Sequence, residues 1–79
     1  MTKREEITHC IEEYIEKYVA DEIILSVNEI RKWPIVDRIC ENSDSANICN
    51  AMDAVKKYRY EYVTGIQGST TYTLKYICD

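Results

Sequence analysis

The hydrophobic pattern of this chain changes its period once, near residue 58, and this change constrains the fold more than any other feature. Before that point, apolar residues recur at steps of three and four, as they do on one face of an α-helix. After it, tyrosine and threonine alternate with other residues, as in a β-strand with one buried face. A helical part followed by two strands predicts an α+β domain, with helices packed on a small antiparallel sheet.

The first helix is predicted over residues 5–19, where glutamates flank one apolar stripe. Thr2 and Glu5 have the spacing of a capping box, which favours a helix start here. The stripe consists of Ile7, Ile11, Tyr14, Ile15, Tyr18 and Val19. A short β-branched run at residues 23–25 follows and predicts a brief strand.

A second helix is expected from Val27, because Ser26 and Glu29 repeat the capping-box spacing. Pro34 interrupts this helix, since proline lacks an amide donor and disfavours helical geometry in the residue before it. Two interpretations stay open: short helices at 27–32 and 34–41, or one kinked helix. A polar turn is expected at residues 41–45.

A third helix is predicted over residues 46–58. Its inward stripe consists of Ile48, Met52 and Val55, whereas Asn47, Asn50, Asp53 and Lys57 lie on the opposite, solvent-facing side. The alternating segments 58–64 and 72–78 then predict two strands of a β-hairpin. A glycine-containing loop at residues 65–69 joins them.

This order of elements resembles that of the winged helix-turn-helix family, of the small archaeal or viral type. The resemblance covers nearly the whole chain. It is strongest in the segments Ser-Val-Asn-Glu-Ile, Ser-Ala-Asn-Ile-Cys-Asn-Ala-Met-Asp-Ala-Val-Lys-Lys-Tyr and Gly-Ile-Gln-Gly-Ser-Thr-Thr-Tyr-Thr-Leu. It implies one domain over residues 1–79 that binds duplex DNA as a regulator of transcription. Helix 46–58 would then lie in the major groove, hairpin 59–78 would be the wing, and the short strand would pair with the hairpin.

The predicted DNA contacts combine amide, hydroxyl and basic side chains. Carboxamides on an exposed helix can pair with adenine at two points, and basic side chains neutralise phosphates. Glycines in the loop let the backbone approach DNA closely. The expected contact residues are Asn47, Asn50, Lys56, Lys57, Arg59, Gln67, Ser69 and Thr70.

Each of these assignments has a structural alternative that the sequence leaves open. Asparagine near a helix start also caps helices, and basic residues at a helix end interact favourably with the helix dipole. Hairpin loops need glycine for their backbone geometry, whatever they bind. The net charge of −4 opposes nucleic-acid binding. However, residues 1–30 hold three basic and eight acidic residues, whereas residues 31–79 hold seven and six.

A second function is therefore considered, in which the same fold binds a protein through its acidic first helix, for example as an inhibitor that imitates the charge of DNA. A homodimer through the first helix and its tyrosines is also considered. One positive surface shared by the loop, the third helix and the basic cluster of Lys56, Lys57 and Arg59 would favour DNA. A neutral surface beside an exposed apolar patch would favour a protein partner.

The sequence predicts neither an enzyme nor a cofactor, metal or small-molecule substrate. Cys10, Cys40, Cys49 and Cys78 contain no Cys-x2-Cys pair, so we expect small core residues, with a Cys40–Cys49 disulfide as the alternative. His9 stands among glutamates, and no glycine-rich phosphate loop occurs. No apolar run approaches the ~20 residues of a membrane span, and no signal peptide is recognisable, so a cytoplasmic protein is expected.

Overall fold

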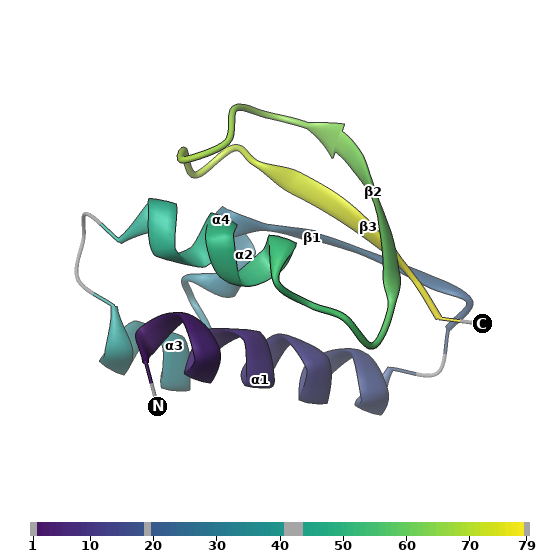
Figure 1. Ribbon diagram of the computed structural model, residues 1–79, viewed down its shortest axis with the longest axis horizontal. Helices are drawn as coiled ribbons and strands as arrows, with labels where there is room; N and C mark the ends of the chain where they lie inside the picture. Colours follow the sequence, from purple (N-terminus) through teal and green to yellow (C-terminus); the bar gives the residue numbers. More distant parts are fainter. Residues whose placement is uncertain (1, 19, 41–43, 79) are drawn as a thin grey trace.

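The computed structural model describes residues 2–18, 20–40 and 44–78. This part of the chain forms a small α+β domain with four helices and a three-stranded antiparallel sheet (Figure 1). In chain order the elements are α1 (Lys3–Lys17), β1 (Glu22–Ser26), α2 (Val27–Ile30), α3 (Pro34–Ile39), α4 (Ser45–Asp53), β2 (Arg59–Thr64) and β3 (Thr73–Ile77). None of the described helices has the length and apolar character that crossing a membrane requires.

The beginning of α1 confirms the N-cap hydrogen bond of the predicted capping box. The side chain of Thr2 accepts a hydrogen bond of 3.2 Å from the backbone N–H of Glu5. The three isoleucines of the predicted stripe, Ile7, Ile11 and Ile15, are buried, whereas Tyr18 is exposed. The helix ends at Lys17, earlier than predicted, because Tyr18 has an extended backbone. Val19, with which the predicted helix ended, lies outside the described residues.

The N-cap hydrogen bond of the second capping box is confirmed as well, since Ser26 Oγ accepts the backbone N–H of Glu29 at 3.2 Å. Of the two interpretations around Pro34, that with two short helices is correct. The backbone of Trp33 is extended and Pro34 occupies the first turn of α3, where its missing N–H costs no hydrogen bond. Both helices are shorter than predicted. The expected polar turn lies largely outside the described residues.

The sheet has the strand order β1-β3-β2. β1 pairs with β3 from Glu22↔Ile77 to Ser26↔Thr73, and β2 pairs with β3 from Arg59↔Ile77 onward. The register of β2 is irregular between Tyr62 and Thr64. The central strand β3 belongs to the hairpin and also pairs with β1, the short strand after α1, as was expected.

The core lies between the sheet and the helices, which pack on one of its faces (Figure 1). The described residues bury no polar or charged side chain. The buried hydrophobic residues are Ile7, Ile11, Ile15, Ile23, Leu25, Val27, Ile30, Val36, Ile48, Cys49, Ala51, Met52, Val55, Tyr72, Leu74 and Tyr76.

The prediction of a helix over residues 46–58 is wrong in its second half, because α4 ends at Asp53. The last carbonyl groups of α4 accept hydrogen bonds from side-chain hydroxyls of other elements: Tyr76 donates to Met52 at 2.8 Å and Tyr60 donates to Asp53 at 3.2 Å. Val55 is buried beyond the helix end. Tertiary contacts thus terminate the helix, and residues 54–58 connect it to β2.

Candidate nucleic-acid interface

The loop between β2 and β3, residues 65–72, packs directly against α4. The backbone N–H of Gly68 donates to Cys49 Sγ at 3.2 Å, and Gln67 Nε2 donates to Asp53 Oδ2 at 2.6 Å. In Figure 1 the beginning of α4 and the tip of the hairpin point toward the same end of the molecule. The sheet thus holds a loop beside a helix, and together they form one surface.

The loop owes its shape to two glycines and to its own hydroxyl groups. Gly65 and Gly68 have φ angles of 93° and 95°, in the left-handed region that favours glycine. Ser69 Oγ donates to the carbonyl of Ile66 at 2.7 Å, and Thr71 Oγ1 accepts the N–H of Ile66 at 3.3 Å. The loop is therefore internally hydrogen-bonded, and Ser69 serves the loop itself.

The two asparagines of α4 differ in their surroundings. Asn47 is half-buried, and its amide donates to Asp44 Oδ1 at 3.3 Å, a local contact at the helix start. Asn50 is exposed, and its side chain makes no hydrogen bond with the described residues. One turn further, Asp53 is half-buried and accepts from Gln67 and Tyr72, so its predicted solvent-facing position is wrong.

The predicted basic cluster does not join this surface. Lys57 Nζ binds Glu16 Oε1 of α1 at 2.8 Å, and Lys56 is exposed in the segment before β2. Lys57 lowers the pKa of Glu16 through this hydrogen bond and its charge, and the same contact raises the pKa of Lys57. Arg59 begins β2 opposite Ile77, at the end of the hairpin remote from the loop.

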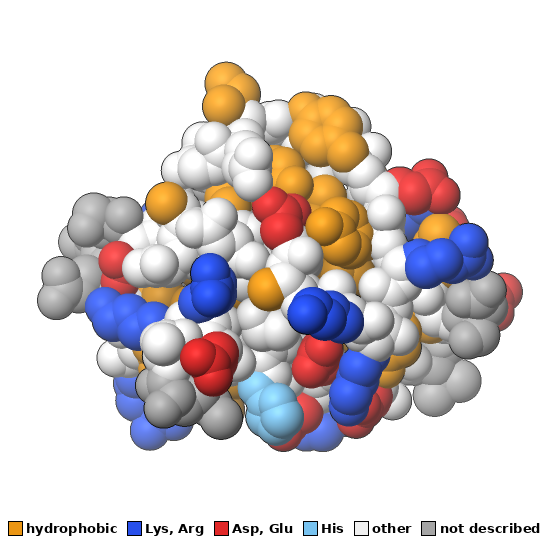
Figure 2. All heavy atoms as spheres, in the orientation of Figure 1, with side chains coloured by type: hydrophobic (Ala, Val, Ile, Leu, Met, Phe, Trp, Pro, Cys, Tyr) orange, Lys and Arg blue, Asp and Glu red, His pale blue; other side chains and the backbone are white. Residues whose placement is uncertain are grey.

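The predicted contact residues therefore fall into two groups. The α4–loop face, as we call it, contains Asn47, Asn50, Gln67, Ser69 and Thr70, whose side chains are amides and hydroxyls. The second group lies apart from this face: Lys56 and Lys57 precede β2, and Arg59 is the first residue of that strand. In Figure 2, Lys and Arg side chains are interspersed with Asp and Glu and form no continuous positive area on the visible face.

The sequence pattern missed an exposed apolar group on the hairpin. The exposed fractions are 38% for Tyr60, 62% for Tyr62 and 75% for Ile66. Hydrophobic side chains gather over the hairpin in the upper part of Figure 2. The alternation of β2 correctly places Tyr60 and Tyr62 on the same face as Tyr76, but β2 is an edge strand and its six residues all remain exposed.

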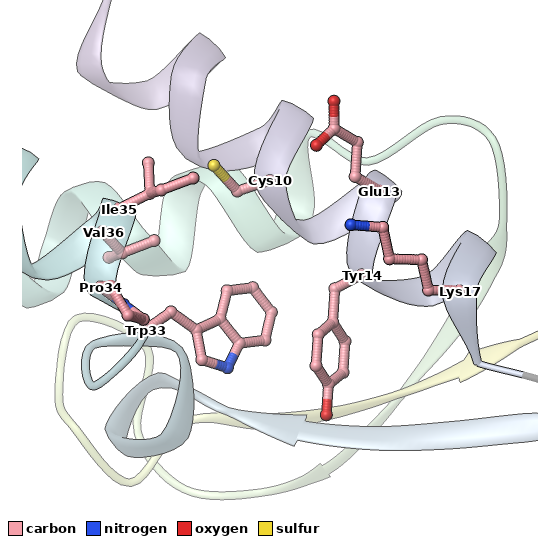
Figure 3. Close-up of a pocket in the computed structure, with 8 residues that line it drawn as sticks. All are labelled: Cys10, Glu13, Tyr14, Lys17, Trp33, Pro34, Ile35 and Val36. Carbon is pink, nitrogen blue, oxygen red and sulfur yellow. The ribbon is translucent and has the colours of Figure 1, made fainter.

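Two aromatic rings border a hollow between α1 and α3 (Figure 3). The rings of Trp33 and Tyr14 stack with centroids 4.4 Å apart. The volume of the hollow is about 330 Å³, and its lining residues are Cys10, Glu13, Tyr14, Lys17, Trp33, Pro34, Ile35 and Val36. Since Tyr14 packs against Trp33 of its own chain, its ring is already used in intramolecular packing.

The described residues contain no group of three or more His, Cys, Asp or Glu side chains that could hold a metal ion. His9 is exposed and lies 3.9 Å from Glu13. The four cysteines are free thiols packed in or against the core, so the Cys40–Cys49 disulfide is not formed. Cys49 instead faces the loop, and burial raises its pKa.

In comparisons with known proteins, no family model, no curated protein and no solved structure matches this chain.

Proposed function

We propose that this chain is a winged helix-turn-helix domain that binds duplex DNA through the α4–loop face and regulates transcription. The strand order β1-β3-β2, with the hairpin loop hydrogen-bonded to α4, is the observation that carries the proposal. In this arrangement the third helix of a winged domain can enter the major groove while the adjacent loop reaches the DNA backbone. We take α4 as that helix.

The chemistry of the α4–loop face favours readout by hydrogen bonds over phosphate neutralisation. Asn50 has an exposed carboxamide, which can pair with adenine at two points. Asn47 serves the helix start and Lys57 binds Glu16, so neither is assigned a DNA contact in this proposal. Because phosphate contacts supply most non-specific affinity, we expect weak binding to random duplexes and tighter binding to a selected site.

The test begins with selection of a preferred duplex from a random library, followed by fluorescence anisotropy at several salt concentrations. We expect a shallow dependence of log Kd on log salt, with a slope of magnitude about 2 or less, since few cations lie on the face. Substitution Asn50→Ala should weaken binding by about 1–3 kcal/mol and relax the sequence preference at one base pair. The control Lys57→Gln should leave affinity nearly unchanged.

Failure of the folded protein to bind any duplex at low salt would refute the proposal. A steep salt slope together with a large effect of Lys57→Gln would retain DNA binding but move it to the basic residues. Both outcomes are distinguishable from a folding defect by circular dichroism of each variant.

A second function, docking to a protein, is favoured by one specific observation. None of the five residues of the α4–loop face carries a positive charge, and an apolar group consisting of Tyr60, Tyr62 and Ile66 is exposed on the hairpin. Exposed apolar groups of this kind mark protein contacts. The acidic helix α1, which the sequence offered as the contact surface for a protein partner, is partly neutralised by the Glu16–Lys57 ion pair. Absence of DNA binding at low salt would make the hairpin the first surface to examine.

A further inference from the structure

β2 leaves one side of its backbone without a strand neighbour. It is the last strand in the order β1-β3-β2, and all six of its residues are exposed. In Figure 1 it runs along the outline of the molecule. An edge of this kind presents a row of unpaired N–H and C=O groups, which is a template for pairing with another strand.

The regular part of this edge is short and carries opposite charges. The irregularity between Tyr62 and Thr64 limits the regular strand to Arg59–Tyr62. Proteins protect edges with bulges, prolines or charged side chains, and like charges opposite each other destabilise a strand pair whereas opposite charges stabilise it. Here Arg59 and Glu61 have opposite signs and lie two residues apart, so both point to the same face of the sheet.

Two-fold symmetry allows only a few registers between two antiparallel copies of β2. Both copies extend one sheet with the same face inward, so the facing residues must have side chains on the same face. A centre at Glu61 would place two like charges opposite each other, and a centre at Tyr62 would use the irregular segment. A centre at Tyr60 places Arg59 of each copy opposite Glu61 of the other.

We infer that two copies of this chain associate through antiparallel β2 strands centred on Tyr60, which makes one continuous six-stranded sheet. The two Arg59–Glu61 pairs lie on the outer face of the sheet. On the inner face Tyr60 faces its copy, a pair of the aromatic type that stabilises neighbouring strands. Tyr60 is already oriented, since its hydroxyl donates to Asp53 and its ring lies edge-on to Tyr76 at 5.8 Å.

This inference differs from a dimer through α1, and it does not rest on DNA binding. Because the α4–loop face lies at the other end of the hairpin from Arg59, edge pairing would leave both copies of that face accessible. The dimer would be modest in area, so its population should rise with protein concentration.

The test is sedimentation velocity over a wide concentration range on four chains: the natural sequence, Arg59→Glu, Glu61→Arg, and the double variant with both changes. We expect the natural chain to dimerise, each single variant to remain monomeric, and the double variant to regain dimerisation. The double variant has the same net charge as the natural chain, so recovery isolates the cross-strand pairs. Lys32→Glu, an exposed change outside β2, is the matched control and should dimerise normally.

A natural chain that stays monomeric at millimolar concentration would overturn the inference. It would also be overturned if the single variants dimerised like the natural chain, or if the double variant stayed monomeric while folded. Within its own chain Glu61 also lies 3.7 Å from Lys75 and Arg59 has an interaction partner too, so each variant is first checked by thermal melting. Should a variant unfold, hydrogen exchange of the natural chain decides, because edge pairing must protect β2 amides as concentration rises.

Discussion

The hydroxyl of Tyr76 donates a hydrogen bond of 2.8 Å to the carbonyl oxygen of Met52, within the buried core. It ties the central strand β3 to the end of α4. The carbonyls on either side are bonded in the same way, since Thr8 donates to Ala51 at 3.0 Å and Tyr60 donates to Asp53 at 3.2 Å. The last carbonyls of a helix have no partner within it, and here three separate elements supply one.

The first prediction concerns this hydrogen bond. Tyr76→Phe should lower the free energy of unfolding by about 1–2 kcal/mol, because the buried carbonyl of Met52 loses its 2.8 Å partner and keeps only backbone contacts from Ala54 and Val55, the latter 3.4 Å long. Tyr60→Phe is the matched control, since its hydroxyl is exposed and water can replace it. Urea denaturation of the three chains measures both effects. Equal losses in the two variants would contradict the assignment of Tyr76 as the buried support.

The second prediction separates the two loop glycines. A Cβ atom at Gly65 would lie 2.1 Å from the carbonyl oxygen of Thr71, whereas at Gly68 it would meet nothing within 4 Å. Both positions have positive φ, so each alanine costs about 1 kcal/mol of backbone strain. Gly65→Ala should therefore destabilise by considerably more than Gly68→Ala in thermal melts. The reverse order would mean that the loop is shaped differently.

The third prediction concerns alkaline pH. Burial raises the pKa of Tyr76, and burial together with the hydrogen bond to Asp53 raises the pKa of Tyr72. The folded state therefore favours the neutral phenols. Their contribution to stability is fully present below the ordinary tyrosine pKa of about 10 and is lost as pH rises above it.

This pH effect can be observed by recording tyrosinate absorbance and far-ultraviolet circular dichroism in one titration. A late group of tyrosines should ionise together with the loss of secondary structure, and Tyr72→Phe should reduce the amplitude of that group. Complete ionisation of all tyrosines in a chain that remains folded would contradict the prediction.

The fourth prediction follows from the position of Asp53 beside Asn50. Asp53→Asn keeps an oxygen that can accept from Tyr72 but removes a negative charge next to the proposed DNA surface. We expect duplex affinity to rise several-fold, while the free energy of unfolding falls by about 1 kcal/mol because the charged hydrogen bonds weaken. Asp37→Asn, an exposed change on α3, is the control and should alter neither quantity appreciably. Unchanged or weaker DNA binding by Asp53→Asn would argue against the α4–loop face.

Local chemistry made much of the fold predictable. The N-cap hydrogen bonds Thr2–Glu5 and Ser26–Glu29 each join residues three apart, so both helix starts can be predicted without knowledge of tertiary contacts. The positive φ of Gly65 and Gly68 is likewise a property of a short loop. The pairing of β1 with the hairpin was expected only from the resemblance to winged domains.

The incorrect predictions depended on contacts between distant segments. The periodicity of residues 46–58 continues beyond Asp53, and only the tyrosine hydroxyls of β2 and β3 show that the helix ends there. The basic cluster looked continuous in sequence, but Lys57 turns to Glu16, which is 41 residues away. Alternation placed Tyr60 and Tyr62 on the core side of the sheet correctly, yet no pattern in one strand reveals that it lies at an edge.

The hydroxyl-capped end of α4 has a consequence for how the protein folds. α4 has nine residues, too few for a stable isolated helix, and its cap donors Thr8 and Tyr76 lie 43 and 24 residues from their acceptors. The entropy of closing both chain segments must be lost before these bonds form. We therefore expect α4 to be completed only after the first helix and the last strand have met. A partly folded chain would then lack the proposed recognition surface altogether, so binding competence would arise in a single cooperative step.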